Sequence, residues 1–441
     1  MSRRRPQTLL TPTDGRGLEF PGRVESLCFR AAPWLAALFI MGSLAVVPHG
    51  YAVTRAHMMA LVFCGLLMLM AARLSGSSSP RVLVWPIVAI LGVWAVSTMA
   101  SVDQERSLAR SAHVPIFALV FPAMQVAGWQ RTSLRLVLAM GATVSLLMVL
   151  DLVMARFIGH ALFTGVTLDP SKGSLGNRND VAACLILLPT AWALLPVRFR
   201  TASWIGVGML TTPAWMFTSS RQAMLAWLIV MLVPLTIRRP PWKSMLACGC
   251  VFVALVVGIL ASGTIRDRIT LTLETGLGER APIGAFGVWQ WWQRPVLGNG
   301  PAIFGELYAA GVAQGWTWRG EPLLPVGMPW PHSLPVEVLC DFGLVGMATF
   351  SLVLVVAAAR LRRGFIQPDF NRDLAVTSTT MLVTTLLVGL VDLSLIKDWV
   401  RVVATMALAL AFMAGATKSP PVAGSSPPHG KKQASISGLK I

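Results

Sequence analysis

The sequence predicts an all-α polytopic membrane protein. Hydrophobic residues make up 55% of the 441 residues and charged residues only 13%, whereas soluble domains carry about 25% charged residues. The apolar residues also fall in long runs, and about 20 helical residues are enough to cross the hydrocarbon core of a bilayer. Together these observations favour about twelve transmembrane helices over a soluble globular fold.

The apolar runs divide the chain into five segments. A basic tail (1–31) precedes nine spans (32–262), a Trp-rich loop (263–331) precedes three more spans (333–417), and a Pro/Ser/Gly-rich tail (418–441) is expected to be disordered. The twelve spans are expected near 32–48, 56–72, 82–100, 112–127, 135–158, 181–197, 202–218, 222–237, 244–262, 333–359, 374–391 and 402–417.

The formal net charge of the chain is +18, and the way this charge is distributed among the loops predicts the orientation of the chain in the membrane. If both termini are cytoplasmic, the two tails and the loops on their side of the membrane carry all of this net charge. Enrichment of Lys and Arg on the cytoplasmic side is the positive-inside rule. The charge therefore gives no support to nucleic-acid binding, and it predicts that the loop 263–331 faces outward.

This outer loop is expected to contain structure, because structureless loops of such length are uncommon in compact proteins. A helix is predicted from about Pro282 to Gln293. The loop also holds six of the sixteen tryptophans, namely Trp289, Trp291, Trp292, Trp316, Trp318 and Trp330. Such a cluster suits an interfacial aromatic belt, and it equally suits a platform for sugar rings.

Two arginines on the predicted outer face are candidates for anion binding. Arg221 opens a span directly after three hydroxyl residues, Thr218 to Ser220, which suit phosphate oxygens. Arg280 opens the loop helix, and it could instead pair with Glu279 or Glu274. The alternative for Arg221 is an interfacial arginine whose head group reaches water.

His332 enters the next span in the stretch MPWPHSLPVEVLCDFGLVG, which begins at Met328. A neutral imidazole at this outer edge could accept a proton from a hydroxyl nucleophile, although a lone interfacial histidine is often merely polar. Glu337 and Asp341 are four residues apart, so they share one helix face. Asp341 lies roughly 13 Å along a helix from His332. The two carboxylates could orient the arginines or line a polar cavity.

The sequence contains no Asp-x-Asp, Cys-x-x-Cys or His-x-x-x-His pattern. These spacings are typical of protein-bound metals, so neither a bound metal nor a cofactor is expected.

Four stretches together resemble the O-antigen ligase and O-antigen polymerase superfamily, which are bacterial inner-membrane glycosyltransferases. They are SLGNRNDVAACLILLP from Ser174, SSRQAMLAWLIVML, the run from Arg280 through Pro295 to Gly298-Asn299-Gly300, and HSLPVEVLCDFGLVG. The resemblance covers about 174–350, and the flanking spans match only in number and hydropathy. Two positions depart from the family pattern: Gly284 replaces a large residue, and Arg178 interrupts the Gly-Asn-x-Asn element.

The resemblance implies a C-type glycosyltransferase-like fold with a periplasmic site. The donor would be a glycan on undecaprenyl pyrophosphate, and the acceptor would be lipid A–core oligosaccharide. His332 would be the general base, and substrate binding would fall to Arg221, Arg280, Asn177, Asn179 and Glu337 without a metal or a nucleotide. Membrane lipids are further partners.

Three alternatives remain at this point. One alternative is a repeat-unit or exopolysaccharide polymerase, which uses the same type of donor. Another is a protein O-oligosaccharyltransferase, which catalyses a related transfer. A transporter is the contrasting class, and it would need Asp151, Asp392, Lys397 and Asp398 for its pathway. Charged residues inside membranes commonly mark such pathways.

Overall fold

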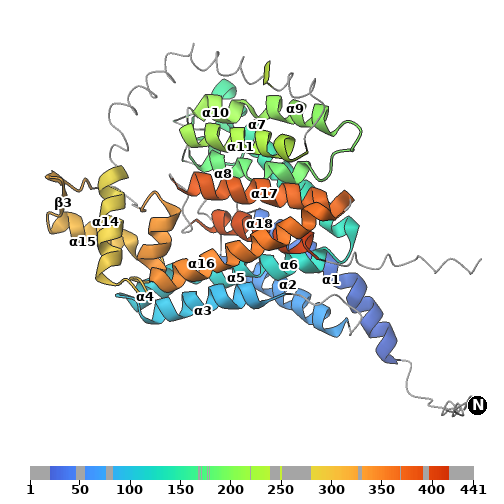
Figure 1. Ribbon diagram of the computed structural model, residues 1–441, viewed down its shortest axis with the longest axis horizontal. Helices are drawn as coiled ribbons and strands as arrows, with labels where there is room; N and C mark the ends of the chain where they lie inside the picture. Colours follow the sequence, from blue (N-terminus) through green and yellow to red (C-terminus); the bar gives the residue numbers. More distant parts are fainter. Residues whose placement is uncertain are drawn as a thin grey trace, which may run out of the picture.

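The computed structural model is an all-α bundle (Figure 1). It describes residues 20–45, 55–75, 83–166, 169, 171–175, 177, 179–218, 220–238, 249–250, 280–325, 330–367, 369–390 and 397–416. The predicted span 244–262 lies almost wholly outside these residues, and the C-terminal tail lies wholly outside them.

The first half of the bundle consists of α-helices, two 3-10 turns and one pair of two-residue antiparallel strands. In order they are α1 (Phe20–Leu44), α2 (Arg55–Leu74), α3 (Trp85–Met99), α4 (Gln104–Ser111), α5 (Val114–Ala118), α6 (Val120–Ala127), α7 (Arg131–Ile158), β1 (His160–Ala161), β2 (Gly165–Val166), η2 (Gly173–Leu175), α8 (Asp180–Leu185), η3 (Leu188–Ala191), α9 (Arg200–Thr211), α10 (Pro213–Thr218) and α11 (Arg221–Arg238).

The second half adds the elements of the segment 280–325 and the last helices. They are α14 (Arg280–Gln293), α15 (Phe304–Ala313), β3 (Thr317–Trp318), β4 (Glu321–Pro322), α16 (Leu334–Ile366), α17 (Asp369–Gly389) and α18 (Asp398–Ala414). Helix α18 is central: twelve of its 17 residues are buried. It packs against α17, α16 and α6.

Among the described residues, five helices are long and apolar enough to cross a membrane, or six if the bent pair formed by α4 with α5–α6 is one span. Large apolar side chains face outward along these helices, including Met59 (71% exposed), Phe63 (65%) and Val355 (65%). Soluble proteins rarely expose apolar surface on this scale. The predicted all-α membrane class agrees with this structure, and the count of twelve spans remains a prediction.

Several predicted spans are irregular. The span at 112–127 continues a preceding helix through a bend of 42°. The span at 181–197 is one short α-helix followed by a 3-10 turn at Pro189, and the span at 202–218 divides at Thr212. The first helix begins at Phe20, twelve residues before the predicted boundary. Proline at or just after three of the breaks explains them, because it lacks the N–H donor and restricts the residue before it.

The charge pattern assigns each loop to one of the two sides of the membrane. Contacts between loops assigned to the same side occur at both ends of the bundle. At one end, Arg110 pairs with Glu306 and His113 lies 3.1 Å from Asp398. At the other, Arg200 lies 2.7 Å from Asp373, and Gln125 bonds to the backbone of Leu83. In Figure 1, α14 and α15 mark the first of these ends. Each of these four contacts joins loops that the charge count places on the same side.

Helix α16 is broken at Gly343, where φ is +62° and ψ is −159°. A break in a membrane helix frees backbone carbonyls that need new donors. The turn at 295–300 supplies them: Asn299 N–H bonds to the Cys340 carbonyl at 2.8 Å and Gly300 N–H to the Asp341 carbonyl at 3.1 Å. The Ser97 hydroxyl also donates to the Asp341 carbonyl at 2.6 Å. The Gly-Asn-Gly turn is thus the partner of the broken helix.

Replacing Gly298 with alanine should undock this turn. A Cβ there would lie 2.5 Å from the Asp341 carbonyl carbon, and φ is already +73°. We expect a loss of about 2–3 kcal/mol in the free energy of unfolding, measured by thermal unfolding in detergent. Gly284→Ala is the matched control, since its Cβ would meet only the Pro331 oxygen at 3.9 Å. Equal destabilisation by both variants would contradict this account.

Candidate functional site

The Asn177–Asp180 turn is joined to the start of α11. Asn179 N–H bonds to the Asn177 side-chain oxygen at 2.9 Å, and the Ser220 hydroxyl donates to the Asn179 side-chain oxygen at 2.9 Å. The Ser220 oxygen also accepts from Ala223 N–H at 3.3 Å, so this serine caps α11. Arg221 follows the cap and is exposed. The two elements singled out for substrate binding therefore lie side by side.

Two of the hydroxyl groups before Arg221 are engaged in hydrogen bonds within the protein. The Thr218 hydroxyl donates to the Ala214 carbonyl at 2.8 Å within its own helix, and the Ser220 hydroxyl is committed to Asn179. Ser219, Gly176 and Arg178 lie outside the described residues. The expectation that these hydroxyls face phosphate oxygens therefore has no support from Thr218 or Ser220.

Asp180 and Lys397 form a buried ion pair at the same place. Their side chains are 6% and 4% exposed, and 217 residues separate them in the sequence. Burying both charges is costly unless they stay together. The pair therefore ties the turn at 177–180 to the start of α18.

Trp330 continues this connection to His332. The Lys397 ammonium lies 4.7 Å from the centre of a Trp330 ring, within the range of a cation–π contact. The Trp330 and His332 rings are 4.7 Å apart at an interplanar angle of 43°. A continuous set of contacts thus runs from Asp180 through Lys397 and Trp330 to His332.

His332 has a backbone conformation that non-glycine residues rarely adopt. Its φ is +53°, in the left-handed region. It stands immediately before Ser333, the residue that precedes α16, and its side chain is half-buried. Such strain persists only where surrounding structure holds it, and it is concentrated at functional sites.

Arg280 belongs to α14, and this helix packs against the segment that contains His332 and the start of α16. Gly287 of α14 lies against Val336 and Pro331, where an added Cβ would come within 2.7 Å and 3.6 Å of their side chains. Phe286 is fully buried between Phe304 and Tyr308. This small core holds α14 against the start of α16, with half-buried Arg280 at the first position of α14.

The outer-loop tryptophans have different surroundings. Trp289 and Trp316 pack around Phe286, with ring centres 5.6 and 5.1 Å from it. Trp292 is 68% exposed and contacts Trp291. Trp316 belongs to the loop core, whereas Trp289 (39% exposed) and Trp292 have the exposure that either a membrane belt or a sugar platform needs.

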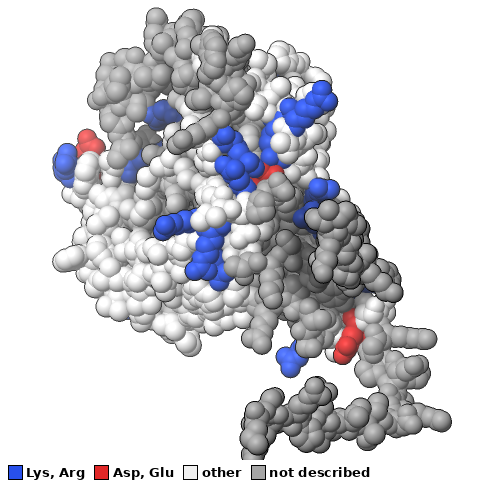
Figure 2. All heavy atoms as spheres, turned by 45° about the vertical axis from the view of Figure 1, so that its right-hand side comes forward, with Lys and Arg blue, Asp and Glu red and all other residues white. Residues whose placement is uncertain are grey.

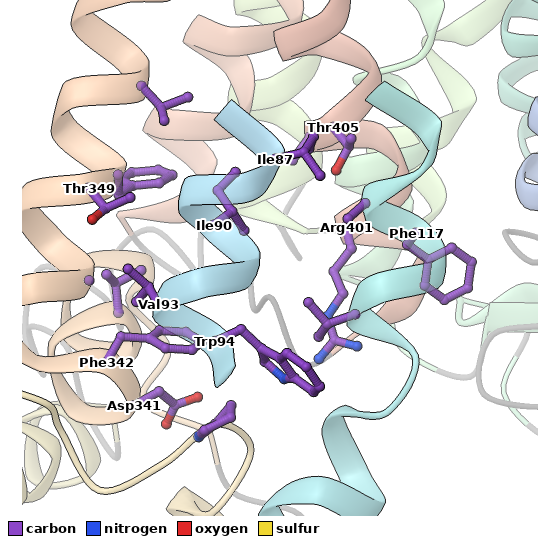
Figure 3. A pocket seen from close by; sticks show the side chains of 18 of the residues that line it. Ile87, Ile90, Val93, Trp94, Phe117, Asp341, Phe342, Thr349, Arg401 and Thr405 are labelled. Atoms are coloured by element: carbon purple, nitrogen blue, oxygen red, sulfur yellow. The ribbon is translucent and has the colours of Figure 1, made fainter. Parts of the chain in front are cut away.

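Glu337 and Asp341 line a cavity, although it is not the polar cavity that the sequence predicted. It has a volume of about 160 Å³ and lies among α3, α5, α16 and α18. Its walls are mainly apolar, and Figure 3 shows Arg401 extending from α18 toward the end at which Asp341 and Trp94 lie. The space suits an apolar chain whose polar end meets two carboxylates and a guanidinium.

The two Asp341 oxygens differ. One accepts the Ala302 N–H at 3.0 Å, and the other is buried without a hydrogen-bond partner among the described residues. Buried polar atoms are nearly always bonded. Asp341 as a whole lines the polar end of the cavity.

Asp151, which a transporter would need, has a structural role. Its buried carboxylate accepts hydrogen bonds from Leu162 N–H at 2.6 Å and from Ser174 N–H at 2.7 Å. The Ser174 hydroxyl donates to it at 2.5 Å. These bonds stabilise the connection between α7 and α8. The Asp151 carboxylate is therefore used in this connection and does not line a transport pathway.

The structure thus connects the elements that carry the six candidate residues, His332, Arg221, Arg280, Asn177, Asn179 and Glu337. Sequence reasoning missed how these elements are joined. It gave Lys397 a role only in a transporter and Trp330 a role only in the tryptophan cluster, and it gave Asp180 and Arg401 no role. The available signal was the presence of Lys397 and Arg401 beside an apolar span, because buried charges need partners.

Comparison with known proteins gives little. No protein-family model matches the sequence, and no curated protein matches it. Among solved structures, the chain is similar to one described as "Structural coordination of polymerization and crosslinking by a peptidoglycan synthase complex". The two are 14% identical, the match covers 75% of this chain and 94% of that one, and the TM-score is 0.43. A likeness at this score decides nothing about activity.

Proposed function

We propose that this protein is a membrane glycosyltransferase of the O-antigen ligase type. It would transfer a glycan from undecaprenyl pyrophosphate to a hydroxyl of lipid A–core oligosaccharide at the periplasmic face of the bacterial inner membrane. One observation supports this most: the Asn177–Asp180 turn, the start of α11 and the start of α16 meet through Lys397 and Trp330.

In the proposed reaction, the acceptor oxygen attacks the anomeric carbon of the donor glycan. The bond from that carbon to the pyrophosphate oxygen breaks, and the lipid pyrophosphate leaves with the electron pair. His332 takes the proton of the acceptor hydroxyl. Arg221 and Arg280 bind the pyrophosphate and offset the charge that develops on it, since guanidinium is always charged and binds such oxygens in pairs.

The remaining candidates have supporting roles. Asn177 and Asn179 shape the turn beside Arg221 and offer amide groups to the glycan. Glu337 lies in the first turn of α16, at the wall of the apolar cavity. The lipid-linked substrates would approach from the membrane, where this cavity lies, and the termini would be cytoplasmic.

A lipopolysaccharide gel tests the proposal. We expect a strain lacking the gene to make core without O-antigen while lipid-linked polymer accumulates. Wild-type protein should restore the ladder. Arg280→Lys should restore little of it, because a lysine ammonium cannot form the bidentate hydrogen bonds that a guanidinium makes to phosphate oxygens. Core bearing a single repeat unit would instead indicate a polymerase. A normal ladder in the deletion strain would remove lipopolysaccharide from the proposal.

A further inference from the structure

Five arginines surround the first two turns of α17 at the end of the bundle opposite His332. We call them the α17 arginine cluster, and they are Arg131, Arg135, Arg200, Arg238 and Arg372. They come from the starts of α7, α9 and α17 and from the end of α11. Figure 2 shows basic side chains gathered over this end of the molecule with few acidic ones between them.

Contacts to α17 join the members of the cluster. The guanidinium carbons of Arg131 and Arg135 lie 5.8 and 6.0 Å from the centre of the Phe370 ring. Arg200 and Arg238 both donate to the same Asp373 oxygen. Arg372 directly precedes this aspartate, so residues 370–373 are the common point of all five.

The positive charge of the cluster is not balanced by its own acids. The first two turns of α17 carry two carboxylates, Asp369 and Asp373, against five arginines. Arg131 and Arg135 are four residues apart on one helix face, where like charges repel. Arg131 and Arg200 also begin their helices, where the helix dipole disfavours a cation. An anion placed here would relieve each of these costs.

Two of the guanidinium groups also have an N–H donor without a hydrogen-bond partner among the described residues. The Nε–H groups of Arg238 and Arg372 are buried without a hydrogen-bond partner among the described residues. In Arg200, by contrast, each of the three nitrogens makes a hydrogen bond: Nε and one terminal nitrogen donate to the Leu195 carbonyl at 3.1 and 2.9 Å, and the other donates to Asp373. Buried N–H donors next to excess positive charge require an oxygen acceptor.

We propose that the α17 arginine cluster binds the phosphodiester headgroup of an anionic membrane phospholipid. A phosphodiester has two unshared oxygens with a single negative charge, which suits guanidinium donors. The source is membrane lipid because α7 and α11, whose ends carry three of the arginines, are apolar helices long enough to cross a bilayer. Headgroups lie at the ends of such helices, and basic pockets between helices commonly bind anionic lipids.

This proposal differs from the positive-inside rule, although both concern the same residues. Orientation depends on the number of Lys and Arg residues near span ends. It requires neither two arginines on one aspartate nor buried Nε–H donors. Lysine substitutions should therefore preserve orientation and still weaken lipid binding.

The test compares lipids on the detergent-purified full-length protein. We expect micelles doped with phosphatidylglycerol to raise the midpoint of thermal unfolding, and native mass spectrometry to detect retained lipid. Phosphatidylcholine should do neither. The double variant Arg131→Gln/Arg135→Gln should lower the affinity for phosphatidylglycerol by about thirtyfold, and its folding is not at risk because both side chains are exposed.

Arg156→Gln is the matched control, because it removes an exposed arginine from the opposite end of the same helix. It should leave lipid binding unchanged. The proposal fails if phosphatidylcholine stabilises equally, or if Arg156→Gln weakens binding as much as the double variant. It also fails if inorganic phosphate at the same concentration gives the same stabilisation, since the site would then serve a soluble anion.

Discussion

Replacing His332 with asparagine should lower glycan transfer by about 10²–10⁴-fold, which is the usual contribution of a general base. Asparagine tolerates positive φ better than most residues, so it keeps the backbone at φ +53° and removes only the imidazole. The measurement is the rate of transfer by purified protein in a mixture of lipid-linked donor and core acceptor.

The design separates chemistry from folding. His332→Asn should unfold at nearly the wild-type temperature, because it introduces no new backbone strain. His160→Asn is the control for a histidine without a proposed role, since His160 is exposed in the short β1 strand. If His332→Asn keeps more than half of the wild-type rate, the histidine is not the base, and the proposed mechanism is wrong.

Replacing Lys397 with methionine should be the most destabilising single change in the site. Asp180 would have to remain buried without the lysine ammonium, and breaking a buried pair in this way costs about 3–5 kcal/mol. The cation–π contact with Trp330 is lost as well. The free energy of unfolding in detergent measures the effect.

A second substitution identifies the cause. Asp180→Asn in the Lys397→Met background should recover much of the loss, because it removes the uncompensated carboxylate. Arg110→Met is the matched control, since it breaks a pair with Glu306 whose side chains are 49% and 21% exposed. Surface pairs contribute about 0–1 kcal/mol. A loss for Lys397→Met no larger than that for Arg110→Met would contradict the role assigned to the buried pair.

The class of fold could be predicted from apolar runs, because a bilayer demands such runs. The loop helix was predicted within two residues of its observed start at Arg280 and at its observed end, Gln293. Some breaks in the spans also had a local signal, such as Pro213 at the start of α10. The break in α16 had none, because the sequence does not show which of several glycines takes a positive φ.

The candidate site could be predicted only in parts. Arg221, Arg280 and His332 stood out because charged or titratable groups beside apolar helices require an explanation. Their connection could not be predicted, because it depends on Lys397 meeting a carboxylate 217 residues away. Pairing over such a distance is determined by how the helices pack, and neither periodicity nor spacing carries that information.

The broken helix α16 also has a consequence for how the chain matures in the membrane. The carbonyls that the break frees need donors from Ser97, which is made early, and from Asn299 and Gly300, which are made shortly before the helix itself. The outer half of α16 therefore cannot reach its final state until the preceding loop has returned to α3. His332 lies just before this half, so the proposed reactive centre would assemble late, after the surrounding scaffold is in place. A chain halted before that step would carry unsatisfied backbone in lipid and would be recognisable to membrane proteases.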